Sequence, residues 1–520
     1  MTEHATRPAI VTRRTMLTGA GAGLVGVALA SCSRTTAKPR AMASINEAAT
    51  LATEAKRPHT GRTRAYRLTP ALTDIDLGGP RVRTLVYGDT VPGTPIRANV
   101  GDELSVAVTN QLDHPTSVHW HGIAMRNDMD GAMPASANIA PGVEFTYRFS
   151  VPDAGTYWAH PHVGLDTDYG LYLPVIVDDP RERADYDTEW IVVLDDWTHG
   201  VGQSPPAIFE GLRKNGRAGM RGTDHGSNPS STSDTGGMVG MGGMGGMGVG
   251  SSVLLGGDAG DIAYPYYLVN GRIPAAPTTF TAKPGQRVRI RIINAGADTA
   301  FRVALAGHQM TVTHTDGFPV QPKLVDALLL GMGERYDVVV TVKDGVFPLV
   351  AMAEGKNALA RALLRTAAGS IPEESHRPVE LDGAVGTVDS FAAATQVRLG
   401  GRPDVNLKAD LGGNMTSYRW TINGRTADQM EPLTIRQGQR ARLTFTNRTM
   451  MWHPMHLHGH TFQVVKASGV PGPRKDTVIV QPMRSVAVDL VADNPGDWML
   501  HCHNAYHQDA GMMTRLDYRS

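Results

Sequence analysis

Pairs of histidines separated by one residue are the clearest chemical signal in this sequence of 520 residues. Random placement of its 19 histidines would give roughly 0.7 such pairs, yet four separate segments each contain one. Alternate side chains of a strand share one face, so each pair can aim two imidazoles at neighbouring points. This spacing predicts a cluster of metal ions. The eight histidines are His119, His121, His160, His162, His456, His458, His501 and His503.

Cysteine usage narrows the choice of metal. Cys32 lies in a leader-like segment, so Cys502, inside the last histidine pair, is expected to be the one free thiol of the mature protein. A single thiolate with imidazoles favours copper over structural zinc, whose closed sites usually show closely spaced cysteine pairs. His507 and Met512 follow Cys502, and His453 lies upstream. Two histidines, one cysteine and a weak methionine ligand are typical of a blue-copper electron-transfer site.

Taken in order, these four segments resemble the four copper motifs of the multicopper oxidases, over essentially the whole mature chain. The resemblance implies four copper ions as cofactors. A type 1 copper would be held by His453, Cys502, His507 and Met512. A type 2 copper would be held by His119 and His456, and a type 3 pair by His121, His160, His162, His458, His501 and His503.

The resemblance also implies an enzyme that collects single electrons and reduces O2 to water. On a strand, Cys502 points away from its two neighbours, so a short covalent path would join the type 1 thiolate to the type 3 ligands. Asp130 stands where related oxidases have an acid that feeds protons to the cluster, and we predict a catalytic role for Asp130 and Cys502. The alternative for Asp130 is a turn residue before Gly131. Gln508 stands where relatives often have a second acid, which leaves half of the proton path open.

A run of methionines suggests the electron donor. Met238, Met241, Met244 and Met247 recur every three residues within a Gly/Ser-rich stretch from about 199 to 260. Thioethers are soft ligands that prefer Cu(I), so this segment could bind substrate Cu(I). The alternative is a glycine-rich loop in which methionine is incidental.

Four other prominent aromatic side chains are expected to be structural. His460 follows the third pair and is predicted to support the ligands rather than bind metal. His308 and His314 are expected to be structural or exposed, and Trp120 is expected to pack in a core.

A weak internal repeat predicts the architecture. Residues 101–110, 285–294 and 438–447 each begin with glycine, alternate polar with apolar residues and end with asparagine. This is the pattern of a half-buried strand, present once per unit. The fold class is therefore predicted as all-β, with three consecutive cupredoxin-like Greek-key β-sandwich domains. We place them at 45–182, 183–370 and 371–520, after a leader and tether at 1–44.

The leader predicts an exported protein. Residues 12–17 resemble a twin-arginine signal, and residues 29–32 resemble a lipobox ending at Cys32. We expect a periplasmic or cell-envelope protein, attached to the membrane only through a lipid on Cys32; the alternative is simple cleavage, for example after Ala43. Lys+Arg and Asp+Glu are equal at 50 each, so no nucleic-acid partner is indicated.

The function predicted from these features is oxidation of Cu(I), serving copper resistance, coupled to four-electron reduction of O2 by a monomeric multicopper oxidase. One alternative is a laccase-like oxidase of phenols, aromatic amines or Fe(II). An alternative of another class is a copper-sequestering cupredoxin protein without catalysis.

Overall fold

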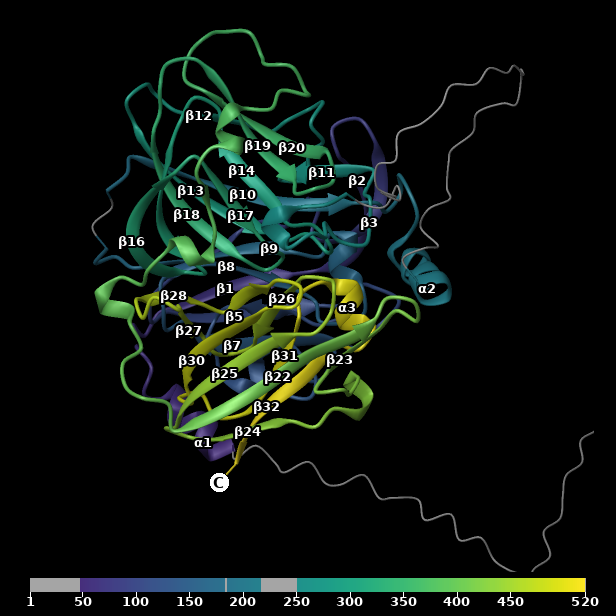
Figure 1. Cartoon of the computed structure of the whole chain (residues 1–520), viewed down its shortest axis with the longest axis vertical. Helices are drawn as coiled ribbons and strands as arrows, with labels where there is room; N and C mark the ends of the chain where they lie inside the picture. The colour runs from purple at the N-terminus through teal and green to yellow at the C-terminus, as the bar shows by residue number, and fades with distance from the viewer. Residues whose placement is uncertain (1–46, 183–184, 217–249, 520) are drawn as a thin grey trace, which may run out of the picture. The chain divides into compact units, whose positions relative to one another are not determined.

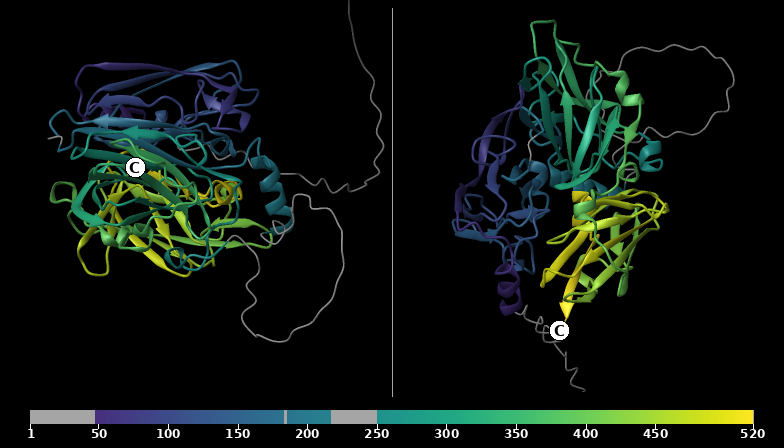
Figure 2. Two further views of the ribbon diagram at one scale, coloured as in Figure 1. Left: turned by 90° about the horizontal axis from the view of Figure 1, so that it is seen from above. Right: turned by 90° about the vertical axis from the view of Figure 1, so that its left-hand side faces the viewer.

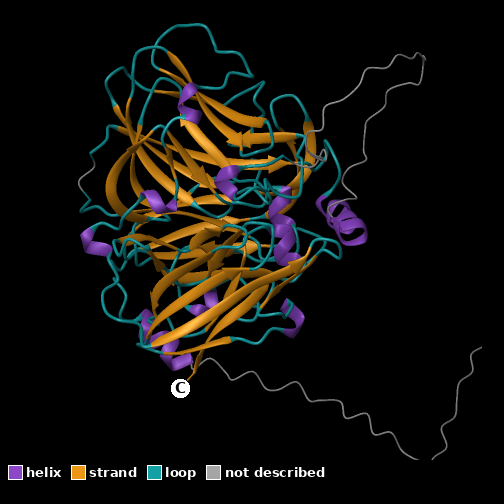
Figure 3. Ribbon diagram, viewed as in Figure 1, coloured by secondary structure: helices purple, strands orange, loops and turns teal. Residues whose placement is uncertain are grey.

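The structure is a computed structural model that describes residues 47–182, 185–216 and 250–519. Strands predominate over helices throughout these ranges (Figure 3), which confirms the predicted all-β class. The leader motifs, Cys32 and the methionine run lie outside the described residues. None of the helices in the described ranges has both the length and the apolar composition needed to cross a membrane.

The first part of the chain forms three sheets, drawn in purple and blue in Figure 1. One has the order β1 (Thr63–Leu68), β5 (Glu103–Thr109), β7 (Glu144–Ser150). A second pairs β2 (Pro70–Asp76) with β3 (Arg81–Tyr87). The third has the order β4 (Ile96–Asn99), β9 (Leu173–Asp178), β8 (Gly155–His160), β6 (His119–His121). The third sheet brings the first two histidine pairs together, because His119 on β6 lies opposite His160, the last residue of β8.

The middle part forms two sheets of six strands. The first has the order β11 (Tyr266–Val269), β10 (Thr188–Trp197), β13 (Arg287–Asn294), β18 (Arg335–Thr341), β15 (Met310–Thr315), β16 (Phe318–Val325). The second has the order β12 (Thr279–Thr281), β20 (Ala358–Arg365), β19 (Val346–Ala353), β14 (Phe301–Leu305), β17 (Ala327–Leu330), β21 (Val385–Gly386).

The last part, green to yellow in Figure 1, also forms two sheets. The first has the order β23 (Arg419–Ile422), β22 (Val405–Asn414), β25 (Arg440–Asn447), β30 (Ser485–Val491), β27 (Phe462–Val465), β28 (Pro471–Lys475). The second has the order β24 (Leu433–Arg436), β32 (Met513–Arg519), β31 (Asp497–Cys502), β26 (His453–Leu457), β29 (Thr477–Val480). Strands β26 and β31 bring the last two histidine pairs together, because His456 lies opposite His501.

The asparagine that ends each sequence repeat makes equivalent hydrogen bonds in all three repeats. The repeats form β5, β13 and β25, and Asn110, Asn294 and Asn447 follow or close these strands. In each case the side-chain oxygen accepts a hydrogen bond from the backbone N–H two residues later. Each side-chain NH2 donates to one carbonyl in the loop that follows and to one in a more distant segment. The repeat therefore encodes a strand together with the anchor of the loop that leaves it.

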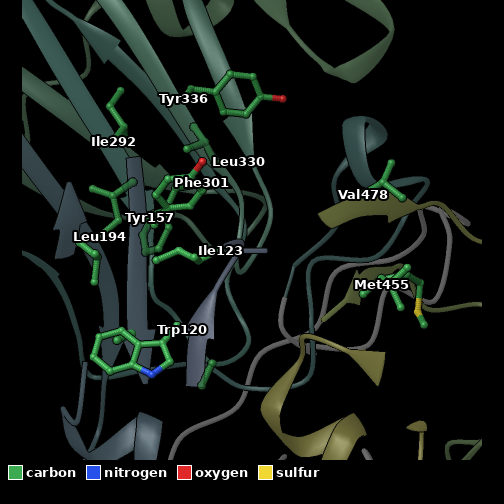
Figure 4. Packing of buried hydrophobic residues seen from close by; sticks show 14 of the residues in the cluster. Trp120, Ile123, Tyr157, Leu194, Ile292, Phe301, Leu330, Tyr336, Met455 and Val478 are labelled. Carbon is green, nitrogen blue, oxygen red and sulfur yellow. The ribbon is translucent and has the colours of Figure 1, made fainter. Parts of the chain in front are cut away.

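Buried apolar side chains pack against the strands that hold the histidines. Figure 4 shows Tyr157 of the first part beside Phe301 of the middle part, within the same buried cluster as Trp120. Trp120 is completely buried in this core, as predicted. Because both of its histidine neighbours are on β6, packing of the indole on one face of the strand directs the imidazoles to the other.

Three α-helices are found in the described ranges. Helix α1 (Glu47–Glu54) opens the described chain, α2 (Pro205–Asn215) follows β10, and α3 (Ala505–Asp509) follows β31. Asn504 caps α3, with its side chain accepting from the N–H groups of Tyr506 and His507. The right-hand view of Figure 2 shows the first part of the chain alongside both the middle and the last parts.

Candidate metal centre

The eight paired histidines converge, although they come from four segments far apart in the sequence. Ring centroids of His119 and His458 lie 3.7 Å apart, as do those of His121 and His456. The Nε2 atom of His501 lies 3.3 Å from that of His162 and 3.0 Å from that of His458. The Nε2 atom of His503 lies 3.2 Å from Nδ1 of His121. Imidazoles from the first and last parts of the chain therefore share one buried cluster.

A second group of possible ligands surrounds Cys502. The Cys502 sulfur lies 3.6 Å from Nδ1 of His453 and 3.7 Å from Nδ1 of His507. These two nitrogens are 3.1 Å apart. Met512 is fully buried, and its backbone N–H donates to the carbonyl of His507 while its carbonyl accepts from the N–H of Cys502. The turn through α3 thus returns the chain to Cys502 and brings a thioether-bearing residue to the same place.

The two groups meet along one strand. Cys502 belongs with His453 and His507, whereas its neighbour His501 belongs with His162 and His458. This is the alternation expected of β31, in which successive side chains point to opposite faces. The structure therefore brings eleven predicted ligands, the eight paired histidines with His453, Cys502 and His507, into two adjacent groups. Met512 is linked to the second group through its backbone.

Asp130 lies at the histidine cluster. Its carboxylate oxygen lies 2.9 Å from Nδ1 of His458, and its carbonyl oxygen lies 2.9 Å from Nδ1 of His119. Asp130 also precedes Gly131, whose φ of 76° marks a left-handed turn residue. The turn at Asp130 thus also places its carboxylate against the rings of two predicted ligands, His458 and His119.

Several polar partners of these rings gave no signal in the sequence. Asp476 contacts the cluster, with one carboxylate oxygen 3.0 Å from Nε2 of His121. Asp261, from the middle part, lies 3.0 Å from Nε2 of His507, and Thr449 lies 2.9 Å from Nε2 of His453. Such partners select which ring nitrogen faces a metal. Only the tertiary structure brings them to histidines that lie four to several hundred residues away.

The electrostatics of the cluster favour neutral imidazoles. Burial first, and then the neighbouring imidazoles, hold the pKa values of His162, His458 and His503 well below the usual value. His507 differs: burial alone would lower its pKa, but hydrogen bonding to Asp261 and Cys502 raises the pKa to about 10. Neutral imidazole is the form that binds a metal ion.

Other residues singled out in the sequence lie outside the two groups. His460 contacts the ligand segment through its Nδ1, 3.1 Å from the carbonyl oxygen of His458, and its Nε2 lies 2.6 Å from the Tyr518 hydroxyl. His308 is buried in a turn, where its Nε2 accepts from the N–H of Lys343. Gln508 is half-buried on α3.

Comparison with known proteins agrees with this geometry. Family models described as multicopper oxidase match three consecutive stretches, residues 73–182, 188–369 and 402–520. The chain therefore belongs to the multicopper oxidase family.

Individual relatives point the same way. The chain is 61% identical over 501 residues to multicopper oxidase MmcO of Mycobacterium tuberculosis, covering 96% of this chain and 95% of that protein. It is 27% identical over 549 residues to a copper resistance protein A homolog of Pseudomonas syringae pv. tomato. This match covers 87% of this chain and 92% of that protein. The crystal structure of the laccase from Botrytis aclada is similar with a TM-score of 0.69 and 26% identity, over 89% of each chain.

Family membership establishes the fold, the class of enzyme and the cofactors. The protein has three cupredoxin-like domains and is an oxidoreductase that uses O2 as the acceptor. Its cofactors are four copper ions, one type 1, one type 2 and two type 3. The residues fit these ions, because the Nε2 atoms of His119, His160 and His456 are buried without a hydrogen-bond partner in the described ranges. Buried polar atoms are rarely left in this state unless a ligand satisfies them.

Proposed function

We propose that this multicopper oxidase oxidises Cu(I) and so contributes to copper resistance. The observation that supports catalysis over mere copper storage is the placement of Cys502 between two ligand groups. Cys502 faces His453 and His507, and the adjacent His501 faces His162 and His458. A store of copper has no need of a covalent link between two such groups.

The ligand assignment that we propose follows the motif order. His453, Cys502, His507 and Met512 hold the type 1 copper. His119 and His456 hold the type 2 copper. The type 3 pair is held by His121, His160, His162, His458, His501 and His503. When bound, these ions supply one-electron transfer at the type 1 position and the reduction of O2 at the other three.

The protein's own side chains prepare the centre for this chemistry. Asp261 and Thr449 hold the outer nitrogens of His507 and His453, which fixes both rings relative to the Cys502 sulfur. We assign Asp130 the role of holding and passing protons at the cluster. Its contacts with His458 and His119 support this role, since its carboxylate lies directly against two proposed ligands.

The proposal that Cu(I) is the donor rests on the soft thioether side chains at 238, 241, 244 and 247. The four methionines at 238, 241, 244 and 247 lie outside the described residues, but both flanks of their segment are described. Before it, the ring of Phe209 on α2 lies 6.4 Å from that of Tyr506, the neighbour of His507. After it, Leu254 accepts a hydrogen bond from Gln481 of the last domain. The described residues on both sides of the segment therefore contact the domain that supplies the proposed type 1 ligands.

We further propose that the protein acts outside the cytoplasmic membrane as a monomer. The twin-arginine-like residues 12–17 and the lipobox-like sequence ending at Cys32 support export and a lipid tether. A relative named copper resistance protein A supports a role in copper resistance.

O2 consumption with Cu(I), Fe(II) and a phenol, measured in parallel, tests the substrate. Deleting residues 238–247 should lower the rate with Cu(I) at least several-fold and leave the phenol rate close to that of the intact protein. Deleting residues 226–235 is the matched control, because that stretch has the same length and no methionine. Equal losses with Cu(I) and phenol would instead support a laccase. Copper binding without O2 consumption would support a sequestration protein.

A further inference from the structure

The middle domain supplies a buried arginine that reaches both other domains. Arg335, the first residue of β18, is fully buried. Its Nε donates to the carbonyl of Thr156 on β8 at 3.0 Å, in the strand that ends at His160. Its two terminal nitrogens donate to the two carboxylate oxygens of Asp476, each at 2.7 Å. One guanidinium thus joins a strand of the first domain to a carboxylate of the last.

Asp476, held by Arg335, contacts two proposed copper ligands. Its Oδ1 atom lies 3.0 Å from Nε2 of His121, and its carbonyl oxygen lies 3.0 Å from Nδ1 of His456. The Thr477 hydroxyl donates to the same Oδ1 at 2.8 Å and lies 3.1 Å from Nδ1 of His456. His121 comes from the first domain and His456 from the last, and their rings stack with centroids 3.7 Å apart. The carboxylate therefore holds the ring of His121 directly, and its Oδ1 atom also lies 3.4 Å from Nδ1 of His456.

The glycine after His121 leaves room for the ion pair. Gly122 has φ of 86°, and a Cβ at this position would lie 2.3 Å from a terminal nitrogen of Arg335 and 2.6 Å from an oxygen of Asp476. Any other residue would push the pair away from the strand that holds the histidines. The sequence around His121 is thus adapted to the approach of a residue more than two hundred positions away.

Further charges from the same two domains surround the pair. Asp316 accepts from the N–H of Arg335 at 2.8 Å and from the N–H groups of Asp476 and Thr477, each at 3.2 Å. The Lys475 ammonium lies 3.1 Å from both Asp316 and Glu334. The backbone on either side of Asp476 is therefore fixed as well as its side chain.

We propose that Arg335 is a positioning residue for the trinuclear copper centre, acting through Asp476 on His121 and His456. The inference rests on the proposed ligand assignment, in which these histidines bind type 3 and type 2 copper respectively. It gives the middle domain a direct part in a centre to which it contributes no proposed ligand. A bidentate guanidinium fixes both the place and the plane of a carboxylate, which the single ammonium of lysine cannot do.

The test compares copper-loaded R335K, R335M/D476L and a matched control, R289K. Arg289 is a nearly fully buried arginine of the same domain, paired with Asp337, and no hydrogen bond or ion pair described for it involves a proposed ligand. The measurements are copper content during titration with a chelator, the type 2 electron paramagnetic resonance signal and the blue absorption of type 1 copper. Thermal unfolding of the metal-free proteins shows which variants fold.

We expect R335K to weaken binding of the trinuclear copper about 10- to 100-fold and to change the type 2 signal, while the blue absorption stays. R289K should change neither signal. R335M/D476L removes both charges and so avoids an unpaired buried ion, which favours folding. It should nevertheless lose trinuclear copper, because His121 loses the carboxylate that holds its ring.

Wild-type trinuclear signals in folded R335K or R335M/D476L would overturn the inference, as would equal losses in R335K and R289K. If R335M/D476L does not fold, R335K decides. A wild-type protein that binds only type 1 copper would overturn the ligand assignment itself, which distinguishes failure of the proposed function from failure of the inference about Arg335.

Discussion

At the scale of single residues, the alternation of side chains on β31 separates two kinds of metal ligand. Cys502 lies on one face of the strand with a soft sulfur, and His501 lies on the other with a harder nitrogen. Both side chains are completely buried, so each donor is shielded from water and from competing metal ions. The short backbone between them is the only covalent connection that the two groups need.

The substitution C502S tests this separation. A serine hydroxyl is a poor ligand for type 1 copper, so the blue absorption and the O2-consuming turnover should both fall to background. The trinuclear copper should remain bound, because none of its proposed ligands is changed. Visible absorption, electron paramagnetic resonance and copper content measure these outcomes. A variant that keeps the blue absorption would show that Cys502 is not the type 1 ligand.

At the scale of secondary-structure elements, one residue pair between β31 and β32 lowers the stability of the last domain. Asp497 on β31 lies opposite Asp517 on β32. Like charges directly opposite each other destabilise an antiparallel pair. Burial first, and then the charge of Asp497, raises the pKa of Asp517 to about 6. The folded protein therefore holds a proton on Asp517 more tightly than the unfolded chain does.

This raised pKa gives a prediction with a definite sign. The protonated Asp517 contributes stability below the ordinary pKa of 3.8, and this contribution is lost as the pH rises through about 6. D517N should therefore raise the free energy of unfolding at pH 7 by about 1 to 3 kcal/mol and reduce its decline between pH 4 and 6.

Denaturant unfolding at several pH values measures the effect of D517N. The control is D326N, since hydrogen bonding to the backbone N–H of Ala384 lowers the pKa of Asp326, so its removal should not stabilise the protein at pH 7. A D517N protein no more stable than the wild type at pH 7 would show that Arg515, which pairs with Asp517 at 2.9 Å, already offsets the repulsion.

At the scale of the whole molecule, the proposed copper ligands join the two ends of the described chain. Residues 119–162 supply four of the clustered histidines and residues 456–503 supply the other four. The imidazoles of the two ends contact one another, and burial lowers the pKa values of these rings. Without metal, these ring contacts contribute little attraction, and hydrogen bonds such as those of Asp130 with His458 and of Asp476 with His121 join the two ends. Metal binding should add to this association, so the two should be coupled.

Removal of copper should therefore lower the thermal stability of the protein. Ligand binding at a concentration 1,000 times Kd stabilises a folded protein by about 4 kcal/mol, so a shift of several degrees in Tm is expected. Calorimetry of the copper-loaded and chelator-treated proteins measures it, and re-addition of copper should restore the first value. C502S should keep most of the shift, because its trinuclear ligands are intact. Equal Tm values with and without copper would show that protein contacts alone hold the domains together.

The sequence by itself determined the class of metal site and the strand-rich fold, and it named the proposed ligands, eleven of which the structure brings together. These features are local: histidine spacing, the residues around Cys502, and alternating repeats that end in asparagine. Strand geometry turns each spacing directly into a direction for the side chain. The equivalent hydrogen bonds of Asn110, Asn294 and Asn447 show how faithfully the repeat specifies a local structure.

Only the tertiary structure decided which residues support the ligands. Asp261, Asp476 and Arg335 stand in segments without a motif, and each reaches a proposed ligand, or the partner of one, on another domain. A carboxylate or guanidinium acts there through its distance and orientation. Sequence spacing specifies neither quantity when the two residues are 141 to 355 positions apart. Packing of three domains around one buried cluster fixes both.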